Sequence, residues 1–117
     1  MDRWKIIYYE TAQGQSPIFD FIQNLDIRIR NKIADVLDLL AEYGIQIGSH
    51  HAKKLAGTPL WELRILGESS IRLFYVAIVG KQFLLLHGII KKTQKTPTKE
   101  IKTALARLKE YQSRIMS

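Results

Sequence analysis

The amino-acid sequence predicts an α+β domain in which helices flank a mainly antiparallel sheet, with its elements in the order β-α-α-β-β-β-α. One observation is an early run of β-branched and aromatic residues, which favours a strand. A second is a pair of segments whose apolar residues recur at helical spacing. A third is a set of three strand-like runs joined by short polar connections. The length of 117 residues suits one domain spanning 1–117.

The N-terminal part is expected to form a strand and two helices. Residues 4–9 are expected to form the strand, because they are rich in β-branched and aromatic residues and the turn-prone Gln13-Gly14-Gln15 follows them. Ser16 is a favoured helix cap, and Pro17 fits the first helical position, where its missing N–H costs nothing. A second helix is expected to start near Asp26 and to end at Gly44.

The C-terminal part is expected to form a meander of three strands and a last helix. The expected strands are residues 60–65, 71–79 and 82–90. Residues 67–70 and Gly80-Lys81 connect them and are short enough for antiparallel hairpins. Residues 50–55 read as an irregular, basic approach to the sheet. Thr96-Pro97 repeats the cap-plus-proline signal. The apolar side of the helix that follows is expected to contain Ile101, Leu105, Leu108 and either Tyr111 or Ile115.

Composition excludes several classes of chemistry. The chain has no cysteine, so disulfides, thiolate metal sites and cysteine nucleophiles are excluded. The sequence lacks the pattern of a signal peptide and any apolar run of membrane-spanning length, so we expect an intracellular, cytoplasmic protein. Walker, GxGxxG, HExxH and GxSxG motifs are absent, and acidic residues are sparse in the second half. We therefore expect neither a metal nor another cofactor.

The positive charge is unevenly distributed along the chain. Residues 1–50 carry five Lys or Arg and seven Asp or Glu, whereas residues 91–117 carry eight and two. The total formal charge is +7. A basic second half is expected of a protein whose surface meets a polyanion such as RNA. The alternative is a basic surface that only keeps the protein in solution.

Two arginines are candidates for a functional sheet face. Side chains alternate along a strand, so Glu62 and Arg64 project together on the side opposite Trp61. Arg72 lies within an apolar run, where an unpaired charge is costly. It must therefore lie at an opening or have a partner such as Glu62. Arg72 is thus either a functional residue or half of a structural Arg–Glu pair across two strands.

Further cations precede and follow the meander, at Lys53-Lys54 and Lys91-Lys92. Several cations around one concavity repel one another unless an anion joins them, and RNA phosphate is the natural anion. When the ribose 2′-OH attacks the adjacent phosphorus, the negative charge on the phosphoryl oxygens must be stabilised. The 2′-OH must also lose a proton, and the leaving 5′ oxygen must gain one. Arginine suits the first task through its fork of donors, whereas lysine is the better proton carrier.

Histidine is the usual acid or base near neutral pH, and the chain contains His50, His51 and His87. His87 falls within an apolar strand and reads either as a histidine with satisfied hydrogen bonds in the core or as a proton carrier. His50 and His51 fall in an expected loop, where a solvated surface position is the simplest interpretation.

Four segments carry a resemblance to a known family. They are Lys-Leu-Ala-Gly at 54–57, Leu-Trp-Glu-Leu-Arg-Ile at 60–65, Ile-Arg-Leu-Phe-Tyr at 71–75 and Lys-Lys-Thr-Gln-Lys-Thr-Pro at 91–97, followed by Glu100-Ile101 and Ala104. With these segments, and over nearly its whole length, the chain resembles the phage-derived HigB-like branch of the RelE/ParE toxin superfamily. The tryptophan-containing and lysine-rich segments are far more specific than any single charged residue.

The resemblance implies a small RelE/ParE-like domain whose basic concave surface enters the ribosomal decoding site and cleaves messenger RNA there. It also implies a partner antitoxin, often a helix-turn-helix protein encoded beside the toxin. Carried over by position, the implied catalytic residues are Arg64, Arg72 and Lys91. The implied RNA-binding residues are Lys53, Lys54, Lys92 and Lys95.

Some features depart from the family pattern, and other functions stay open. Several ribonucleases of the superfamily carry a tyrosine or a histidine cluster near the C-terminus, where this chain has only Tyr111, so the general base is unassigned. ParE-type members share the fold but inhibit DNA gyrase without cutting RNA. A regulatory module that binds RNA without catalysis is a third alternative.

Overall fold

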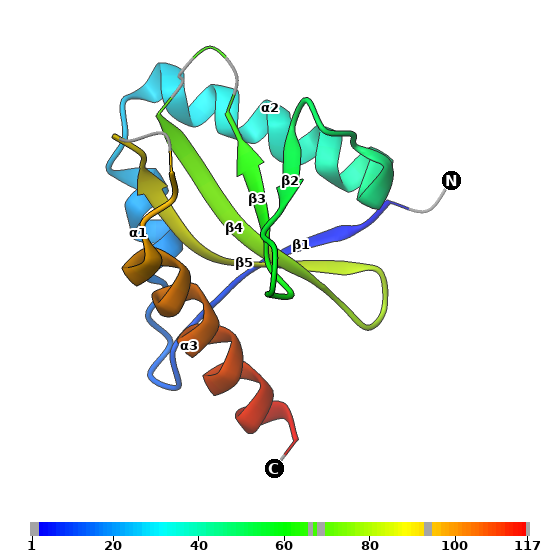
Figure 1. Cartoon of the computed structure of the whole chain (residues 1–117), viewed down its shortest axis with the longest axis vertical. Helices are drawn as coiled ribbons and strands as arrows, with labels where there is room; N and C mark the ends of the chain where they lie inside the picture. Colours follow the sequence, from blue (N-terminus) through cyan, green and yellow to red (C-terminus); the bar gives the residue numbers. More distant parts are fainter. Residues whose placement is uncertain (1–2, 66, 68–69, 93–94, 117) are drawn as a thin grey trace.

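The computed structural model describes residues 3–65, 67, 70–92 and 95–116. Parts of two segments discussed above, Glu68-Ser69 and Thr93-Gln94, lie outside the described residues. Figure 1 shows the elements in chain order. They are β1 (Lys5–Tyr8), α1 (Pro17–Gln23), α2 (Ile27–Tyr43), the 3-10 turn η1 (Gly44–Gln46), β2 (Ala52–Lys54), β3 (Trp61–Arg64), β4 (Ile71–Ile78), β5 (Gln82–Ile90) and α3 (Thr98–Ile115).

The strands form one five-stranded sheet in the order β1-β5-β4-β3-β2. β1 runs parallel to β5, and the other neighbours are antiparallel, so the predicted α+β class with a mainly antiparallel sheet is confirmed. The prediction of an irregular approach at residues 50–55 is wrong for Ala52–Lys54. These three residues form an edge strand because their backbone pairs with Trp61–Leu63 of β3. The observed order therefore contains one strand more than expected.

The predicted starts of α1 and α2 are confirmed. The Ser16 hydroxyl accepts a hydrogen bond from the Phe19 N–H at 3.3 Å, and Pro17 takes the first helical position. The Asp26 carboxylate accepts one from the Arg28 N–H at 2.8 Å. α2 ends at Gly44, whose φ of +61° is a conformation that glycine adopts without a steric penalty. None of the helices among the described residues has the length and apolar character needed to cross a membrane.

The start of α3 differs from the prediction. Thr96 was expected to cap the helix, but Pro97 occupies the cap position and no side chain caps the first turn. The Thr96 hydroxyl instead donates a hydrogen bond to Glu62 Oε2 at 2.9 Å. A buried carboxylate needs donors more than a solvent-exposed helix end does, since water can satisfy the latter.

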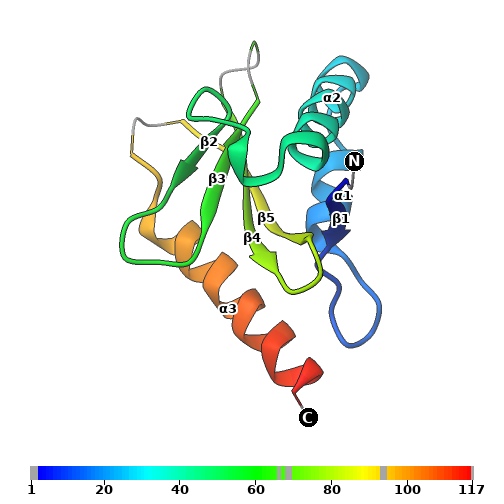
Figure 2. The same ribbon diagram turned by 90° about the vertical axis from the view of Figure 1, so that its right-hand side faces the viewer.

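The two faces of the sheet are covered by different helices. At Gly88 an added Cβ would lie 2.6 Å from the Phe21 ring and 2.9 Å from Ile18, so α1 packs directly on this side. The preceding residue, His87, points to the other side, where it meets Glu100 and Arg107 of α3. Figure 2 shows α1 and α2 together beside the sheet, with α3 set apart from them.

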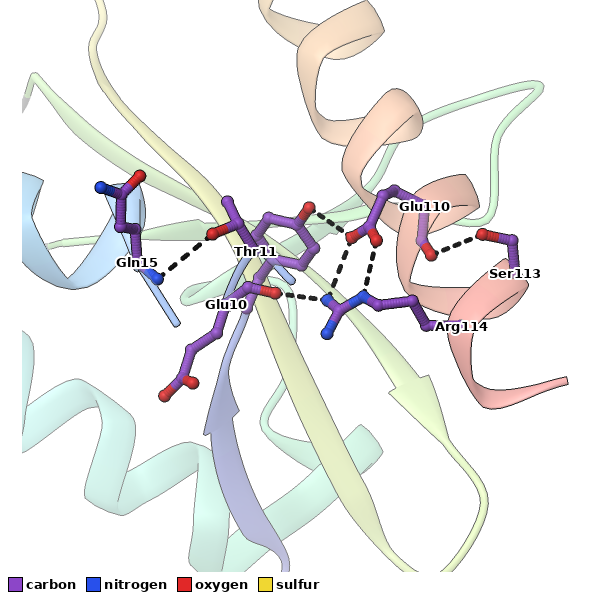
Figure 3. A network of polar contacts seen from close by, with 7 residues as sticks. Glu10, Thr11, Gln15, Glu110, Ser113 and Arg114 are labelled. Atoms are coloured by element: carbon purple, nitrogen blue, oxygen red, sulfur yellow. Dashed lines mark hydrogen bonds and ion pairs between the residues drawn. The ribbon is translucent and has the colours of Figure 1, made fainter. Parts of the chain in front are cut away.

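Polar contacts hold the C-terminal half of α3 against the chain just after β1. The Tyr9 hydroxyl donates to Glu110 Oε1 at 2.6 Å, and Tyr9 is 4% exposed. Arg114 donates to both Glu110 oxygens and to the backbone carbonyl of Glu10 (Figure 3). Of the two residues considered for the end of the apolar side, Tyr111 packs against the core, whereas Ile115 is 63% exposed.

His87 is hydrogen-bonded at both ring nitrogens. Arg107 Nη1 lies 3.0 Å from Nδ1, and Glu100 Oε1 lies 2.7 Å from Nε2. An arginine can only donate, so Nδ1 accepts and the ring proton resides on Nε2. Burial lowers the pKa of His87 below its ordinary 6.5, and Arg107 acts in the same direction, while Glu100 opposes both. The satisfied hydrogen bonds expected of a structural His87 are therefore present, and its side chain is 15% exposed.

We predict that His87 makes the protein less stable in mild acid. The folded state disfavours protonation of His87. The contribution of His87 to the free energy of unfolding is therefore complete above pH 6.5 and is lost as the pH falls below that value. Urea unfolding of the wild type and of His87→Gln at pH 7.5 and pH 5.5 measures this change in stability. The wild type should lose more stability on acidification than the variant, and equal losses would contradict the assignment.

We predict that Gly88→Ala destabilises the packing of α1 on the sheet. The new methyl group would overlap Phe21 and Ile18, a crowding that costs about 1–3 kcal/mol and a few degrees in melting temperature. Thermal melts of Gly88→Ala, Phe21→Leu and the double variant test this. The double variant should recover part of the loss, and strictly additive losses would show that Phe21 is not the obstacle.

Candidate anion-binding site

The sheet brings the three predicted catalytic residues to the face that α3 partly covers. Arg64 of β3 pairs directly with Arg72 of β4, and Glu62 pairs with Phe74. Residues that pair in this way share a face. Lys91 follows β5 and reaches the same cluster, with its Nζ 3.7 Å from Glu62 Oε1. Residues 27 positions apart in the sequence, Arg64 and Lys91, thereby contribute to one site.

Glu62 lies at the centre of this cluster and is only 2% exposed. Arg72 Nε lies 3.0 Å from Glu62 Oε1, which confirms the expected contact between these two residues. The Nε–H is not aimed at the oxygen as a hydrogen bond requires, so this contact is an ion pair. With the Thr96 hydroxyl on Oε2, the carboxylate meets two cations and one neutral donor. Such pairing is what makes a buried carboxylate tolerable.

Arg72 is held in place by its surroundings. Its side chain is 16% exposed, and Nη1 donates to the backbone carbonyl of Ile71 at 2.9 Å. Together with the ion pair to Glu62, this contact restricts the orientation of the guanidinium plane. Both alternatives considered for Arg72 from the sequence are therefore true: it has a carboxylate partner, and its side chain still reaches the surface.

Arg64 is the cation that this arrangement leaves uncompensated. It lies directly opposite Arg72, where like charges repel each other. It is partly exposed, and no hydrogen bond or ion pair joins its side chain to another of the described residues. Arg72 and Lys91 contact Glu62, and Arg64 lies opposite Arg72 in the register of β3 and β4, so three cations accompany a single negative charge in this part of the sheet. The excess positive charge makes the cluster an attractive place for an anion such as phosphate.

The four lysines predicted to bind RNA do not all lie on this face. Lys53 pairs with Glu62 in the register of β2 and β3, so it shares the face of the cluster, and it is exposed. Lys54 pairs with Trp61 on the opposite face, where its Nζ donates to the Thr58 carbonyl at 2.5 Å. Lys92 and Lys95 are exposed in the segment that leads from β5 to α3.

Sequence reasoning missed the contribution of Thr96. A threonine before a proline is a common helix cap, so Thr96 was expected to cap α3. It instead contacts Glu62, a residue 34 positions earlier in the sequence. His51 was assigned to the surface, but its Nδ1 is buried and has no hydrogen-bond partner among the described residues. Within that part of the chain, no three His, Asp or Glu side chains gather in a way that could hold a metal ion.

No curated protein sequence matches the chain. The family model described as "Phage derived protein Gp49-like (DUF891)" matches residues 20–109, which include α2, all of β2 to β5 and most of α3. The matched part contains Glu62 and every cation of the cluster. The chain therefore belongs to the phage-derived Gp49-like family, a family of toxin–antitoxin system toxins in the RelE/HigB group.

Proposed function

We propose that this protein is the toxin of a type II toxin–antitoxin system, of the HigB-like kind, and that it cleaves messenger RNA on the ribosome. The observation that carries the proposal is the cluster around Glu62. One buried carboxylate positions Arg72 and Lys91, while Arg64 beside them keeps its charge unpaired by the described residues. A site of this kind suits an RNA phosphate whose charge increases during reaction.

In this proposal the chain cleaves RNA without a metal. The ribose 2′-OH loses its proton, its oxygen forms a bond to the adjacent phosphorus, and the bond from phosphorus to the 5′ oxygen breaks. Arg64 and Arg72 stabilise the charge on the phosphoryl oxygens through their forks of N–H donors. Lys91, in its charged form, gives a proton to the departing 5′ oxygen. Lys53, Lys92 and Lys95 contact neighbouring phosphates, and the group that takes the 2′ proton is left unassigned.

The proposal includes a second partner. A cationic face that binds RNA must be covered or altered when the toxin is neutralised, and an acidic segment has the complementary charge. We propose that this segment belongs to an antitoxin with a helix-turn-helix domain, encoded near the toxin. Cytoplasmic location follows from the proposed action on ribosomes.

We predict that Arg64→Lys lowers the rate of cleavage on programmed ribosomes by a factor on the order of 10². The substitution keeps the charge but removes the fork of donors at the proposed phosphate. The melting temperature should stay close to that of the wild type, because no side-chain hydrogen bond or ion pair with the described residues is lost. Arg28→Lys, at an arginine whose side chain is 79% exposed, is the matched control and should cut at the wild-type rate. A fully active Arg64→Lys protein would refute the proposed role of Arg64.

We predict that Glu62→Gln destabilises the protein by about 3 kcal/mol, because Arg72 and Lys91 would be left largely buried without a counter-charge. Urea unfolding measures this, with Glu42→Gln on the exposed surface of α2 as the control. Inorganic phosphate should raise the melting temperature of Glu62→Gln more than that of the wild type, since a bound anion replaces the lost charge. A variant with wild-type stability and an unchanged response to phosphate would show that Glu62 does not organise the cluster.

A further inference from the structure

A pocket of about 590 Å³ lies on the face of the sheet opposite Glu62. Its walls include three aromatic residues, Trp61, Tyr75 and Phe83. Three cations also line it: Lys54, and at its edge Lys53 and Arg64, whose register partners lie on the Glu62 face. Trp61 and Tyr75 pair directly across β3 and β4, and both alternate with residues of the Glu62 face. The pocket volume falls in the range of small-molecule sites, about 300–1,000 Å³. The proposed cleavage step uses Arg64 at the edge of this pocket but none of its aromatic residues.

The aromatic part of the pocket is firmly built. Phe83 is 1% exposed, Trp4 stacks on it with ring centroids 4.3 Å apart, and the Tyr75 ring meets it edge-on at 5.3 Å. Trp61, in contrast, is only partly buried and is the aromatic side chain of the pocket most open to a ligand. Its cross-strand neighbour on β2 is Lys54, so a cation stands beside the exposed ring.

The charges that line the pocket restrict the chemistry of its ligand. No acidic residue is among the described residues that line it, so its three cations are not balanced there. An apolar ligand would leave these charges unmatched, and a simple anion would leave the aromatic walls unused. A flat aromatic ring attached to a phosphate uses both, because nucleic-acid bases stack on aromatic side chains and phosphates bind Lys and Arg.

Arg64 connects the pocket to the proposed cleavage site. It lies at the end of β3, it is paired with Arg72 on the Glu62 face, and it also lines the pocket. A single RNA strand that passes over this end of the sheet would place one phosphate at the cluster and a nearby base at the mouth of the pocket. We propose that the pocket holds one nucleotide of the RNA, with its base against Trp61 and its phosphate near Lys54. This inference rests on the proposed function only in taking the nucleotide from the RNA that is cut.

The test measures binding of free nucleotides, which needs no cleavage. Amide and indole N–H signals of the wild-type protein are followed by NMR during titration with AMP, CMP, GMP or UMP, and with ribose 5-phosphate as the probe without a base. Nucleotides should shift the signals of Trp61, Ala52 and Ala77, three residues of the pocket. At least one nucleotide should bind about fivefold more tightly than ribose 5-phosphate, the lower end of what stacking of a base contributes.

Three variants locate the ligand. Trp61→Leu should weaken nucleotide binding about fivefold or more and leave binding of ribose 5-phosphate unchanged. If Trp61→Leu does not fold, the exposed Lys54→Ala serves instead and should weaken binding of AMP more than binding of adenosine. Lys109→Ala, at an exposed lysine of α3 outside the pocket, is the matched control and should bind nucleotides as the wild type does.

Several outcomes would overturn the inference. Ribose 5-phosphate that binds as tightly as the nucleotides would show an anion site without a base pocket. Nucleotide-induced shifts confined to the Glu62 face, or an acidic peptide that fills the pocket when nucleotides do not, would also exclude it. If nucleotides fill the pocket of a protein that cuts no RNA, only the proposed function fails. If Trp61→Leu cuts RNA at the wild-type rate and nucleotides leave the pocket signals unchanged, only this inference fails.

Discussion

The ion pairs of one buried carboxylate hold the candidate site of this molecule together. Glu62 contacts Arg72 of β4, Lys91 after β5 and Thr96 before α3, and it belongs itself to β3. A charge that is 2% exposed is tolerated only if its partners stay in place, so these four parts of the chain are constrained relative to one another. The same constraint explains why α3 begins at Thr98 without a capping side chain, since the threonine that would have capped it is engaged elsewhere.

This constraint also sets the charge of the surface. Glu62 balances one of the positive charges of Arg72 and Lys91, so the cluster with Arg64 keeps an excess of positive charge at a fixed geometry. A preorganised cationic site stabilises a charged transition state better than flexible surface lysines do, because it needs no rearrangement during reaction. Membership of a toxin family and a preorganised cationic cluster together support the proposal that this protein cleaves RNA.

Much of the fold could be predicted from local patterns. Ser16, Asp26 and Gly44 determine helix ends through nearby backbone contacts, and the two-residue alternation of β3 correctly separates Glu62 and Arg64 from Trp61. The missed features depend on contacts between distant parts of the chain. β2 is too short and too polar to be recognised from its own residues, because it becomes a strand only by pairing with β3. This pairing places Lys53 and Lys54 on opposite faces of the sheet. The parallel pairing of β1 with β5 and the pocket beside Trp61 likewise arise only in the folded chain.

The candidate site was predictable in its residue types but not in its organisation. The alternation of side chains and the family resemblance both indicated Arg64 and Arg72. The free-energy cost of burying an unpaired charge indicated Glu62 as the partner of Arg72. They could not show that Lys91 shares the same carboxylate, because this contact depends on how β5 ends next to β4. Nor could they separate a catalytic arginine from a structural one, since Arg72 has the contacts of both.

In the proposed reaction the Glu62 cluster stabilises attack of a ribose 2′-OH on the adjacent phosphate. The most direct measurement is single-turnover cleavage by the purified wild-type protein of messenger RNA bound to ribosomes, with and without a 2′-deoxyribose immediately before the cut. We predict that the normal message is cut to a fragment ending in a 2′,3′-cyclic phosphate or a 3′-phosphate, and that no cut occurs at the deoxy position. Equal cleavage of both messages, or intact messages together with inhibited supercoiling by gyrase, would contradict it.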